Sequence, residues 1–448
     1  MLNVNIRDFG AESNGVLQTD KIQNAIDYCF KQGGGMVVIP QGDFLVGDVR
    51  LRSNVGIHLA KGAHLIGSRN PEDYMNILSD TVQPLSENDL TDVLWLPVDV
   101  RKNFHHMNKA GSRWNNAIIR AVDAENISVT GEKGSYIDGR DCFDEIGEEK
   151  YRGPHAINFH RCKDVRFSGY EIRNSANWAH ALFDCGNIQF DNITVIAGHD
   201  GIHITSCKNI SVDNSKFYTG DDCIAGIDNT DVKVKNCVMN TACSAFRFGG
   251  TRVYIGDCRM FGPAKYLFRG SLSDEEKREG KSPDGSHRYN MLSAYTYYAD
   301  FSREIKNIPG DIVIENCSIE NTDRFIHYNF SGNEPWQKNK PLKDITFKNI
   351  KAVGIKNPLT LYGGAEEPLS FNLYDSSISF KDADGSFMNL CYYKKVYLKN
   401  VEVTGIEKSP LIKKWSNEGE IITENIMYDS INLEKEAMAE EDFKCTAI

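Results

Sequence analysis

The sequence predicts an all-β chain folded as a parallel β-helix, a solenoid, with a capping helix at its N-terminal end. The main observation is a repeat of short strand-like segments that open with Asn or Asp and an apolar residue. Four successive segments begin at Asp164, Asn187, Asn209 and Asp231, in steps of 23, 22 and 22 residues, and a variant at Arg252 follows after 21. A constant step of this length is typical of coils that stack along one axis.

A column of asparagines is the second observation. Asn or Asp recurs five residues into the segments, at Asn192, Asn214, Asn236 and Asp257, and in later segments at Asn316, Asn349 and Asn400. Identical turns stacked about 4.8 Å apart allow each side-chain amide to hydrogen-bond the ones above and below it. The column therefore favours parallel coils in register.

The capping helix is predicted from about Thr19 to Lys31. Its apolar stripe consists of residues three or four positions apart: Ile22, Ala25, Ile26 and Cys29. Three consecutive glycines from Gly33 end the helical pattern. The open end of a β-helix exposes unpaired strand edges that invite aggregation, so a helix at this point would cover them.

Length and charge limit the remaining architecture. A chain of 448 residues suggests roughly two or three domains. Solenoids grow without splitting, so we expect a single domain over residues 1–448, with loop insertions at about 70–125 and 270–310. The charged run Asp274–Glu279 is expected to be a solvated loop. The net charge of −11 argues against a nucleic-acid partner, and no apolar run is long enough to indicate a membrane partner. The oligomeric state is not predicted.

The twelve cysteines are predicted to be structural thiols. Three lie two residues before a coil start and three lie six residues after one: Cys162, Cys185, Cys207, Cys237, Cys258 and Cys317. Small, partly apolar side chains suit the inside of a tight turn, and no cysteine pair has the spacing of a zinc site, so we expect no metal and no cofactor. The first residues show no signal peptide, so we expect a cytoplasmic location with reduced thiols.

Three aspartates in two glycine-containing turns are the candidate catalytic residues. Asp200 and Asp222 each lie 13 residues after a coil start, so the count stacks them on neighbouring coils with Asp221 alongside. Ser244 and Lys265 continue the same column. Two unit charges about 5 Å apart, at an effective dielectric of roughly 20, repel by about 3 kcal/mol. One carboxyl should therefore hold a proton while another stays ionised, as glycosidases require. The alternative is calcium binding or a structural role in the turn.

Further motifs surround these acids: Asn174-Ser175-Ala176-Asn177-Trp178, His199-Asp200-Gly201 and Gly220-Asp221-Asp222-Cys223-Ile224-Ala225. Together with residues 4–68 and the coil count, they resemble glycoside hydrolase family 28, the polygalacturonases and related pectin hydrolases. The resemblance implies a right-handed parallel β-helix and cleavage with inversion at the anomeric carbon. It also implies that Asp221 is the general acid and that Asp200 and Asp222 hold and activate water.

The chain departs from the family pattern where the sugar would be held. Gly198-His199-Asp200 stands where most members have Asn-Thr-Asp, and Ser244 stands where the histidine of a Gly-His-Gly motif would lie. Only Arg269 remains of the Arg-Ile-Lys motif that grips the substrate carboxylate. The candidate substrate-binding residues are His199, His203, Ser244, Arg247, Lys265 and Arg269.

The coil count predicts a row of basic residues along the strand that leaves the acids. His180, His203 and Arg247 each lie 16 residues after a coil start. Phe246 and Phe248 flank Arg247 with the parity of core residues, which should turn Arg247 outward. Such a row either binds a uronate or only coats the outer face, and both interpretations stay open.

The sequence thus predicts an inverting glycoside hydrolase that cleaves pectin-derived or related acidic oligosaccharides by exo action, with an oligosaccharide or polysaccharide as its partner. Two alternatives stay open. A polysaccharide lyase on the same architecture would use Arg247 as its base and calcium at the acids. A non-catalytic glycan-binding β-helix would leave the acids without a chemical role.

Overall fold

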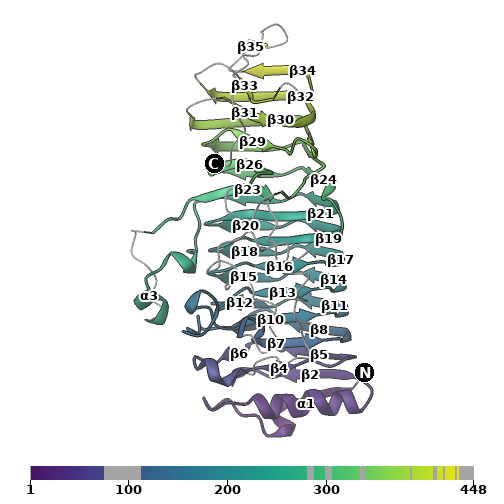
Figure 1. The fold of residues 1–448 in the computed structure, drawn as a ribbon. Coiled ribbons are helices and arrows are strands. Elements are labelled where there is room, and N and C mark those ends of the chain that lie inside the picture. The colour runs from purple at the N-terminus through teal and green to yellow at the C-terminus, as the bar shows by residue number, and fades with distance from the viewer. Residues whose placement is uncertain are drawn as a thin grey trace. The chain divides into compact units, whose positions relative to one another are not determined.

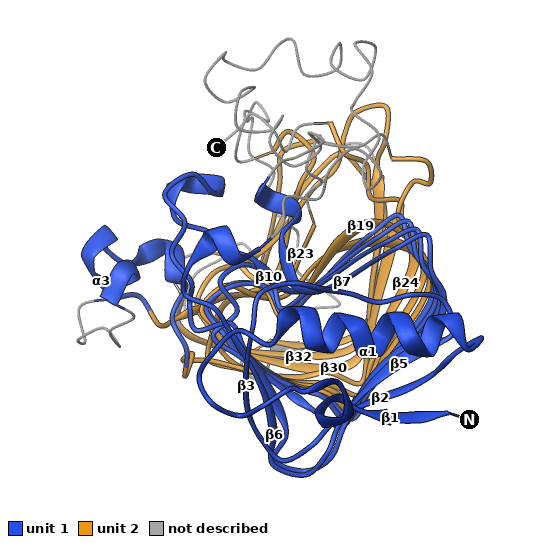
Figure 2. Cartoon of the chain, turned by 90° about the horizontal axis from the view of Figure 1, so that it is seen from below, with its two compact units in different colours: residues 1–221, 266–288 blue, residues 222–265, 289–448 orange. Residues whose placement is uncertain are grey.

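A computed structural model describes most of the chain. The described residues are 2–74, 113–279, 287–297, 305–332, 339–383, 386–406, 411–416, 419–428 and 431–432. The chain divides into two compact units: residues 1–221 with 266–288 form unit 1, and residues 222–265 with 289–448 form unit 2 (Figure 2). The single domain expected over the whole chain stays a prediction.

Unit 1 begins with the predicted capping helix. α1 (Thr19–Lys31) has the predicted bounds, and its apolar stripe is completely buried. The helix contacts β1 (Asn3–Asn5), β2 (Gly35–Ile39), β4 (Val49–Arg50) and β5 (Val55–Leu59), and it lies across the first coil of this unit (Figures 1 and 2). The edges of that coil therefore face a helix instead of solvent, as expected for a cap.

The other elements of unit 1 form coils of three strands each, and each strand pairs in parallel with its counterpart on the next coil. In chain order they are η1 (Ile6–Phe9), β3 (Gly42–Val46), β6 (Ala63–Gly67), η2 (Pro71–Asp73), η4 (Arg113–Asn115), β7 (Ala117–Val122), β8 (Glu125–Gly131), β9 (Tyr136–Asp138), η5 (Glu148–Lys150), β10 (His155–His160), β11 (Lys163–Ser168), β12 (Glu171–Arg173), β13 (His180–Phe183), β14 (Gly186–Asp191), β15 (Thr194–Ala197), β16 (Ile202–Thr205), β17 (Lys208–Asp213), β18 (Lys216–Thr219), η6 (Arg269–Ser271) and α3 (Asp274–Glu279).

Unit 2 is also a stack of parallel strands, apart from the antiparallel pair of β34 and β35. Its elements are β19 (Ile224–Lys235), β20 (Val238–Thr241), β21 (Ser244–Gly256), β22 (Arg259–Phe261), β23 (Met291–Tyr297), β24 (Gly310–Glu315), β25 (Ser318–Glu320), β26 (Thr322–Asn329), β27 (Asp344–Lys348), β28 (Lys351–Ile355), β29 (Leu359–Tyr362), β30 (Leu369–Ala383), β31 (Met388–Cys391), β32 (Tyr393–Ile406), β33 (Ile412–Lys414), β34 (Glu420–Tyr428) and β35 (Ile431–Asn432).

The strand register confirms the repeat that the sequence predicts. On successive coils of unit 1, Ile127, Val165, Ile188 and Ile210 occupy one row. All four side chains are buried. The steps of 23 and 22 residues from Val165 to Ile188 and Ile210 return the chain to the same core position, whereas the step from Ile127 to Val165 is 38 residues long.

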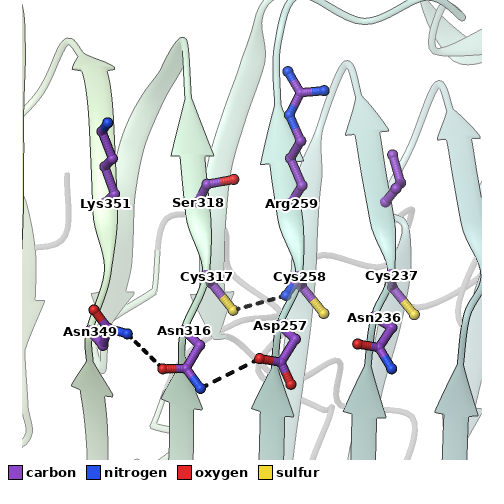
Figure 3. Close-up of a pocket in the computed structure, with 11 residues that line it drawn as sticks. Asn236, Cys237, Asp257, Cys258, Arg259, Asn316, Cys317, Ser318, Asn349 and Lys351 are labelled. Carbon is purple, nitrogen blue, oxygen red and sulfur yellow. Dashed lines mark hydrogen bonds between the residues drawn. The ribbon is translucent and has the colours of Figure 1, made fainter.

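Asparagine recurs at the turns for two physical reasons. Asn316 (φ 56°) and Asn349 (φ 50°) adopt the left-handed backbone conformation, which Asn and Asp tolerate better than most residues. Their amides also form a ladder in unit 2, where they line a pocket (Figure 3). Asn349 Nδ2 donates to Asn316 Oδ1 at 2.7 Å, and Asn316 Nδ2 donates to Asp257 Oδ1 at 3.4 Å. The predicted column is confirmed at these positions.

In unit 1 the ladder follows different residues. Asn214 Nδ2 donates to Asp191 Oδ1 at 2.8 Å, and not to the asparagine that the count places beside it. The residues at the coil starts form the continuous ladder: Asn209 donates to Asn187 at 2.9 Å, and Asn187 donates to Asp164 at 2.7 Å. The predicted position of Asn214 is confirmed, because it follows the paired residues Asp191 and Asp213 just as Asn192 does, but the hydrogen bond predicted between the two amides is replaced by the bond to Asp191.

The described cysteines are free thiols, and all but Cys243 are buried. In unit 1 the backbone N–H of Cys162 points to Cys185 Sγ at 3.3 Å, and that of Cys185 points to Cys207 Sγ at 3.4 Å. The stacked, structural placement of these cysteines is confirmed.

Much of the two predicted insertions lies outside the described residues. β7 and β23 nevertheless fall within them, and they pair in parallel with β10 and β26 respectively. Coils therefore continue through residues 117–122 and 291–297, where insertions were predicted. Within the described ranges, no helix has the length and apolar character needed to cross a membrane.

Candidate active site

Two turns in unit 1 follow paired strands and carry the predicted acids. β15 and β18 lie side by side on neighbouring coils, and the turns after them contain Gly198 and Gly220. A Cβ atom on Gly220 would lie 1.7 Å from the carbonyl oxygen of Leu267. A Cβ atom on Gly198 would lie 2.8 Å from Cβ of Arg269. No side chain fits at either position, because residues 267–269 pass directly over the turns.

Asp200 is held by a buried histidine. Its carboxylate is 1% exposed, and its Oδ2 atom lies 2.8 Å from His203 Nδ1. The His203 ring stacks flat on Trp178, with centroids 3.5 Å apart and an interplanar angle of 4°. Trp178 in turn packs edge-on against Trp114 at 4.7 Å. His203 was predicted as a substrate ligand, but it is buried and its contacts fit the positioning of Asp200 better.

Asp221 is the more exposed of the two acids in unit 1. Its backbone oxygen accepts a hydrogen bond from Thr219 Oγ1 at 2.7 Å, which fixes the turn. The negative charge of Asp221 acts on the guanidinium of Arg152. Burial works to lower the pKa of that guanidinium, but Tyr151, nearby glutamates and Asp221 raise it well above its usual range. Asp221 therefore lies within electrostatic reach of Arg152, which also pairs with Glu148 and Glu149.

Asp222 is fixed within unit 2 by two donors. The backbone N–H of Ser244 donates to its Oδ1 at 3.0 Å, and Arg247 Nε donates to its Oδ2 at 2.7 Å. Phe246 and Phe248 are buried in the core on either side of Arg247, as the predicted alternation of inward and outward side chains requires. Ser244 and Arg247 were predicted as substrate ligands. In the structure each of them bonds an acid predicted to be catalytic.

His199 lies at the centre of an aromatic and basic environment in unit 1. It is completely buried, stacks on Tyr151 at 5.8 Å and meets Phe268 edge-on at 6.1 Å. Burial, followed by the charges of Arg152 and Arg269, holds the pKa of His199 well below its usual value, so its ring is neutral.

The predicted row of His180, His203 and Arg247 is wrong at His180. β13 and β16 pair His180 with Ile202, and His203 with Ala181. The link between Arg173 and His180 is one residue longer than the equivalent link on the next coil, so the count slips there. His180 instead points into the core, where its ring nitrogens bond Tyr170 Oη at 2.8 Å and the Gly201 carbonyl at 3.0 Å.

The structure corrects the column position predicted for Lys265 and shows the contacts of Arg269. In unit 2 the strand partner of Ser244 is Ser293, so Lys265 does not continue the acid column, and its backbone N–H bonds Asn240. Arg269 is 3% exposed, and its guanidinium donates to the carbonyl oxygens of Ala176 and Asp141. Arg269 therefore ties its segment to the coils, and its role as a substrate ligand stays a prediction.

Buried neutral histidines predict acid sensitivity. Burial lowers the pKa of His155 from 6.5 to about 3, so between these values the unfolded chain binds more protons. Stability is complete above pH 6.5 and falls as the pH drops toward 3. By pH 5 the loss should be about 2 kcal/mol. Between pH 7 and 5 the free energy of unfolding of His155→Phe, measured with denaturant, should fall by about 2 kcal/mol less than that of wild type. The partly exposed His58→Asn should behave as wild type, and an unchanged slope in His155→Phe would contradict the prediction.

Residues 80–244 match the family model described as Glycosyl hydrolases family 28. The predicted resemblance to family 28 is confirmed. A probable polygalacturonase of Vitis vinifera is 25% identical over 232 residues, which cover 49% of this chain and 43% of that protein. An exo-poly-alpha-D-galacturonosidase of Dickeya chrysanthemi is 27% identical over 252 residues, covering 49% and 41%. The chain thus spans less than half the length of these curated relatives.

Among solved structures, an exopolygalacturonase of Thermotoga maritima is similar with a TM-score of 0.61 and 16% identity, covering 97% of this chain and 93% of that one. At this identity the likeness shows the fold alone. It confirms the right-handed parallel β-helix.

The family 28 match contains all three aspartates and ends at Ser244. Arg247, Lys265 and Arg269 lie beyond it. His199, His203 and Ser244 lie within the match, and the catalytic and substrate-binding roles of all these residues stay predictions.

Sequence reasoning missed three residues close to Asp221 and His199: Tyr151, Arg152 and Lys277. Lys277 is only 8% exposed, although its charged run was expected to be solvated. All three lie on segments outside the regular coils, so no coil count could place them. The dense charge of residues 148–152, directly before a Gly-Pro pair, was the only signal in the sequence.

Proposed function

We propose that the chain is an inverting glycoside hydrolase that acts by exo cleavage on pectin-derived or related acidic oligosaccharides. The observation that carries the proposal is the pair of turns, Gly-His-Asp and Gly-Asp-Asp, within the family 28 match. The names of the relatives, a probable polygalacturonase and an exo-poly-alpha-D-galacturonosidase, support an acidic substrate and exo action.

Asp221 is the proposed general acid. A proton donor has to reach the oxygen that leaves with the departing sugar. Of the three aspartates, Asp221 alone is only partly buried, so its carboxyl is the one best placed to meet a substrate from solution.

Asp200 and Asp222 are proposed to hold and activate the attacking water. Each carboxylate is buried and bonded to a basic side chain, His203 for Asp200 and Arg247 for Asp222. These hydrogen bonds fix the orientation of each carboxylate, and a general base has to be held in position to accept a proton from water.

The ion pair in unit 2 weighs against the lyase alternative. A lyase would need Arg247 as the base that abstracts a proton from the sugar. Arg247 donates to Asp222 at 2.7 Å, and a guanidinium held by a carboxylate keeps its proton. An unsaturated, ultraviolet-absorbing product that disappears on adding a chelator would support the lyase instead.

Substrate turnover tests the proposal. Wild type and Asp221→Asn are incubated with trigalacturonate, rhamnogalacturonan fragments and neutral oligosaccharides, and reducing-end release is followed with product sizes. We expect release from acidic chains by wild type only, with one short product from the first time point onward. Equal release by both proteins would reject the proposed acid, and a broad product ladder would reject exo action.

A further inference from the structure

A set of positive charges surrounds one buried aromatic ring in unit 1. Lys277 Nζ lies 4.3 Å from the centroid of the Tyr151 ring, and the guanidinium carbons of Arg269 and Arg152 lie 5.6 and 5.8 Å from it. His199 stacks on the same ring. Each of these five side chains belongs to a buried residue. They are called the Tyr151 cluster below.

The partners of these cations leave one charge poorly balanced. Arg152 bonds both carboxylate oxygens of Glu149, at 3.0 and 3.3 Å. Lys277 has a different environment among the described residues. Its ion pair is with Asp274 at 3.7 Å, and that carboxylate is 72% exposed. A buried ammonium whose acidic partner is distant and solvated is stabilised by any anion that enters beside it.

Polar atoms of the cluster, and of Asn177 beside it, have no hydrogen-bond partner among the described residues. Both ring nitrogens of His199 are buried, and no described residue hydrogen-bonds them. The same holds for Asn177 Nδ2, whose Oδ1 accepts from Arg152 at 3.3 Å. A buried polar group left unpaired costs about 1–3 kcal/mol, which a ligand oxygen or hydroxyl would recover. Fully buried nitrogens without partners, next to a buried cation, indicate a site prepared for a polar anion.

The cluster adjoins the proposed general acid. Burial raises the pKa of Tyr151 well above its usual range, and the negative charges of Glu149 and Asp221 add to this rise, which places Asp221 within electrostatic reach of the ring. The geometry agrees, because Gly220, the neighbour of Asp221, packs against Leu267, and the next residue, Phe268, contacts the ring of His199. A group held at the cluster would therefore lie close to the bond that Asp221 is proposed to protonate.

We propose that the Tyr151 cluster binds the carboxylate of a uronic acid unit of the substrate, with Lys277 supplying the charge and His199 and Asn177 supplying hydrogen bonds. This inference rests on the proposed function, and it names the residues that make the site selective for acidic sugars. It assigns the carboxylate contact to Lys277 and not to Arg247, whose guanidinium is held by Asp222, and it leaves Arg269 in the cluster as a supporting positive charge.

Binding of two matched sugars tests the assignment without turnover. Isothermal calorimetry measures Kd for digalacturonate and for its neutral counterpart galactobiose, with all proteins carrying Asp221→Asn so that the sugars are not cleaved: this parent, taken as wild type for binding, and the parent with Lys277→Met, Lys277→Arg or Arg278→Gln. Arg278 is the matched control, because it lies on the same short helix and pairs with Glu145 outside the cluster. In Lys277→Met we expect the Kd for digalacturonate to rise about tenfold or more and that for galactobiose to stay within about twofold. Lys277→Arg should recover most of the affinity, and Arg278→Gln should match wild type.

Several results would overturn the assignment: wild-type affinity for digalacturonate in Lys277→Met, an equal loss for both sugars, or no preference of wild type for the acidic sugar. If Lys277→Met does not fold, His199→Phe keeps a ring at the same place and removes its nitrogens, and it should weaken digalacturonate binding selectively. If wild type hydrolyses acidic oligosaccharides but Lys277→Met does not weaken the binding of digalacturonate, only this site is rejected and the proposed function stands. Selective binding without any hydrolysis would reject the proposed function and leave the site in place.

Discussion

Asp221→Asn is expected to lower the rate of oligogalacturonate hydrolysis by about 10²- to 10⁴-fold, the usual contribution of a general acid. The amide has the shape of the carboxyl group but cannot deliver a proton to the leaving oxygen. Because Asp221 is only partly buried, the free energy of unfolding should change by no more than about 0.5 kcal/mol. Initial rates of reducing-end release, measured together with unfolding curves, separate the two effects.

Asp20→Asn is the control for this experiment. Asp20 is an exposed aspartate on α1, in the cap of unit 1, and its replacement should leave both rate and stability at wild-type values. If Asp221→Asn kept more than roughly a tenth of the wild-type rate, Asp221 would not be the general acid.

Asp200→Asn is the second change expected to have a large effect. Loss of the carboxylate that orients and activates water should lower kcat by about 10²- to 10⁴-fold. The asparagine oxygen can still accept the hydrogen bond from His203 Nδ1, which is 2.8 Å from Asp200 Oδ2 in wild type, so the fold should survive. Rate and thermal unfolding measured on the same preparation check both statements.

His203→Gln tests whether the histidine acts through Asp200. A positioning residue should lower kcat less than Asp200→Asn does, and it should shift the pH profile of kcat because the protonation of Asp200 depends on it. A wild-type kcat in Asp200→Asn would contradict the proposal that Asp200 and Asp222 activate water. An unchanged pH profile in His203→Gln would leave His203 as a purely structural residue stacked on Trp178.

The fold could be predicted because one physical constraint repeats along the chain. Each coil must bury a residue such as Val165 or Ile188 at the same core position and turn through the left-handed conformation at residues such as Asn316. Both demands leave a sequence signal with the period of the coil. The capping helix has its own period, and its bounds were predicted residue for residue.

The site could be predicted only in part, because a count holds only while every link keeps its length. The extra residue between Arg173 and His180 moved His180 out of the predicted row and into the core. In unit 2 the strand that pairs with β21 at Ser244 is β23, so Ser293 and not Lys265 follows Ser244. Errors of this kind cannot be seen in the spacing itself.

The residues around Tyr151 could not be predicted by any repeat. Arg152 and Lys277 are 125 positions apart in the sequence and lie on irregular segments. Only folding brings both residues to the ring of Tyr151. The sequence around each of them is rich in charged residues, so it predicts exposure and not burial. Long-range contacts between loops are therefore the part of the site for which the structure was needed.

The stereochemistry of the first product tests the proposed function most directly. Proton NMR spectra recorded during the first minutes of the reaction with α-linked trigalacturonate show which anomer of the new reducing end appears before mutarotation. We expect the β anomer first, and no signal above background with Asp221→Asn. The α anomer first, an unsaturated product, or no product from wild type would contradict an inverting hydrolase built on these three aspartates.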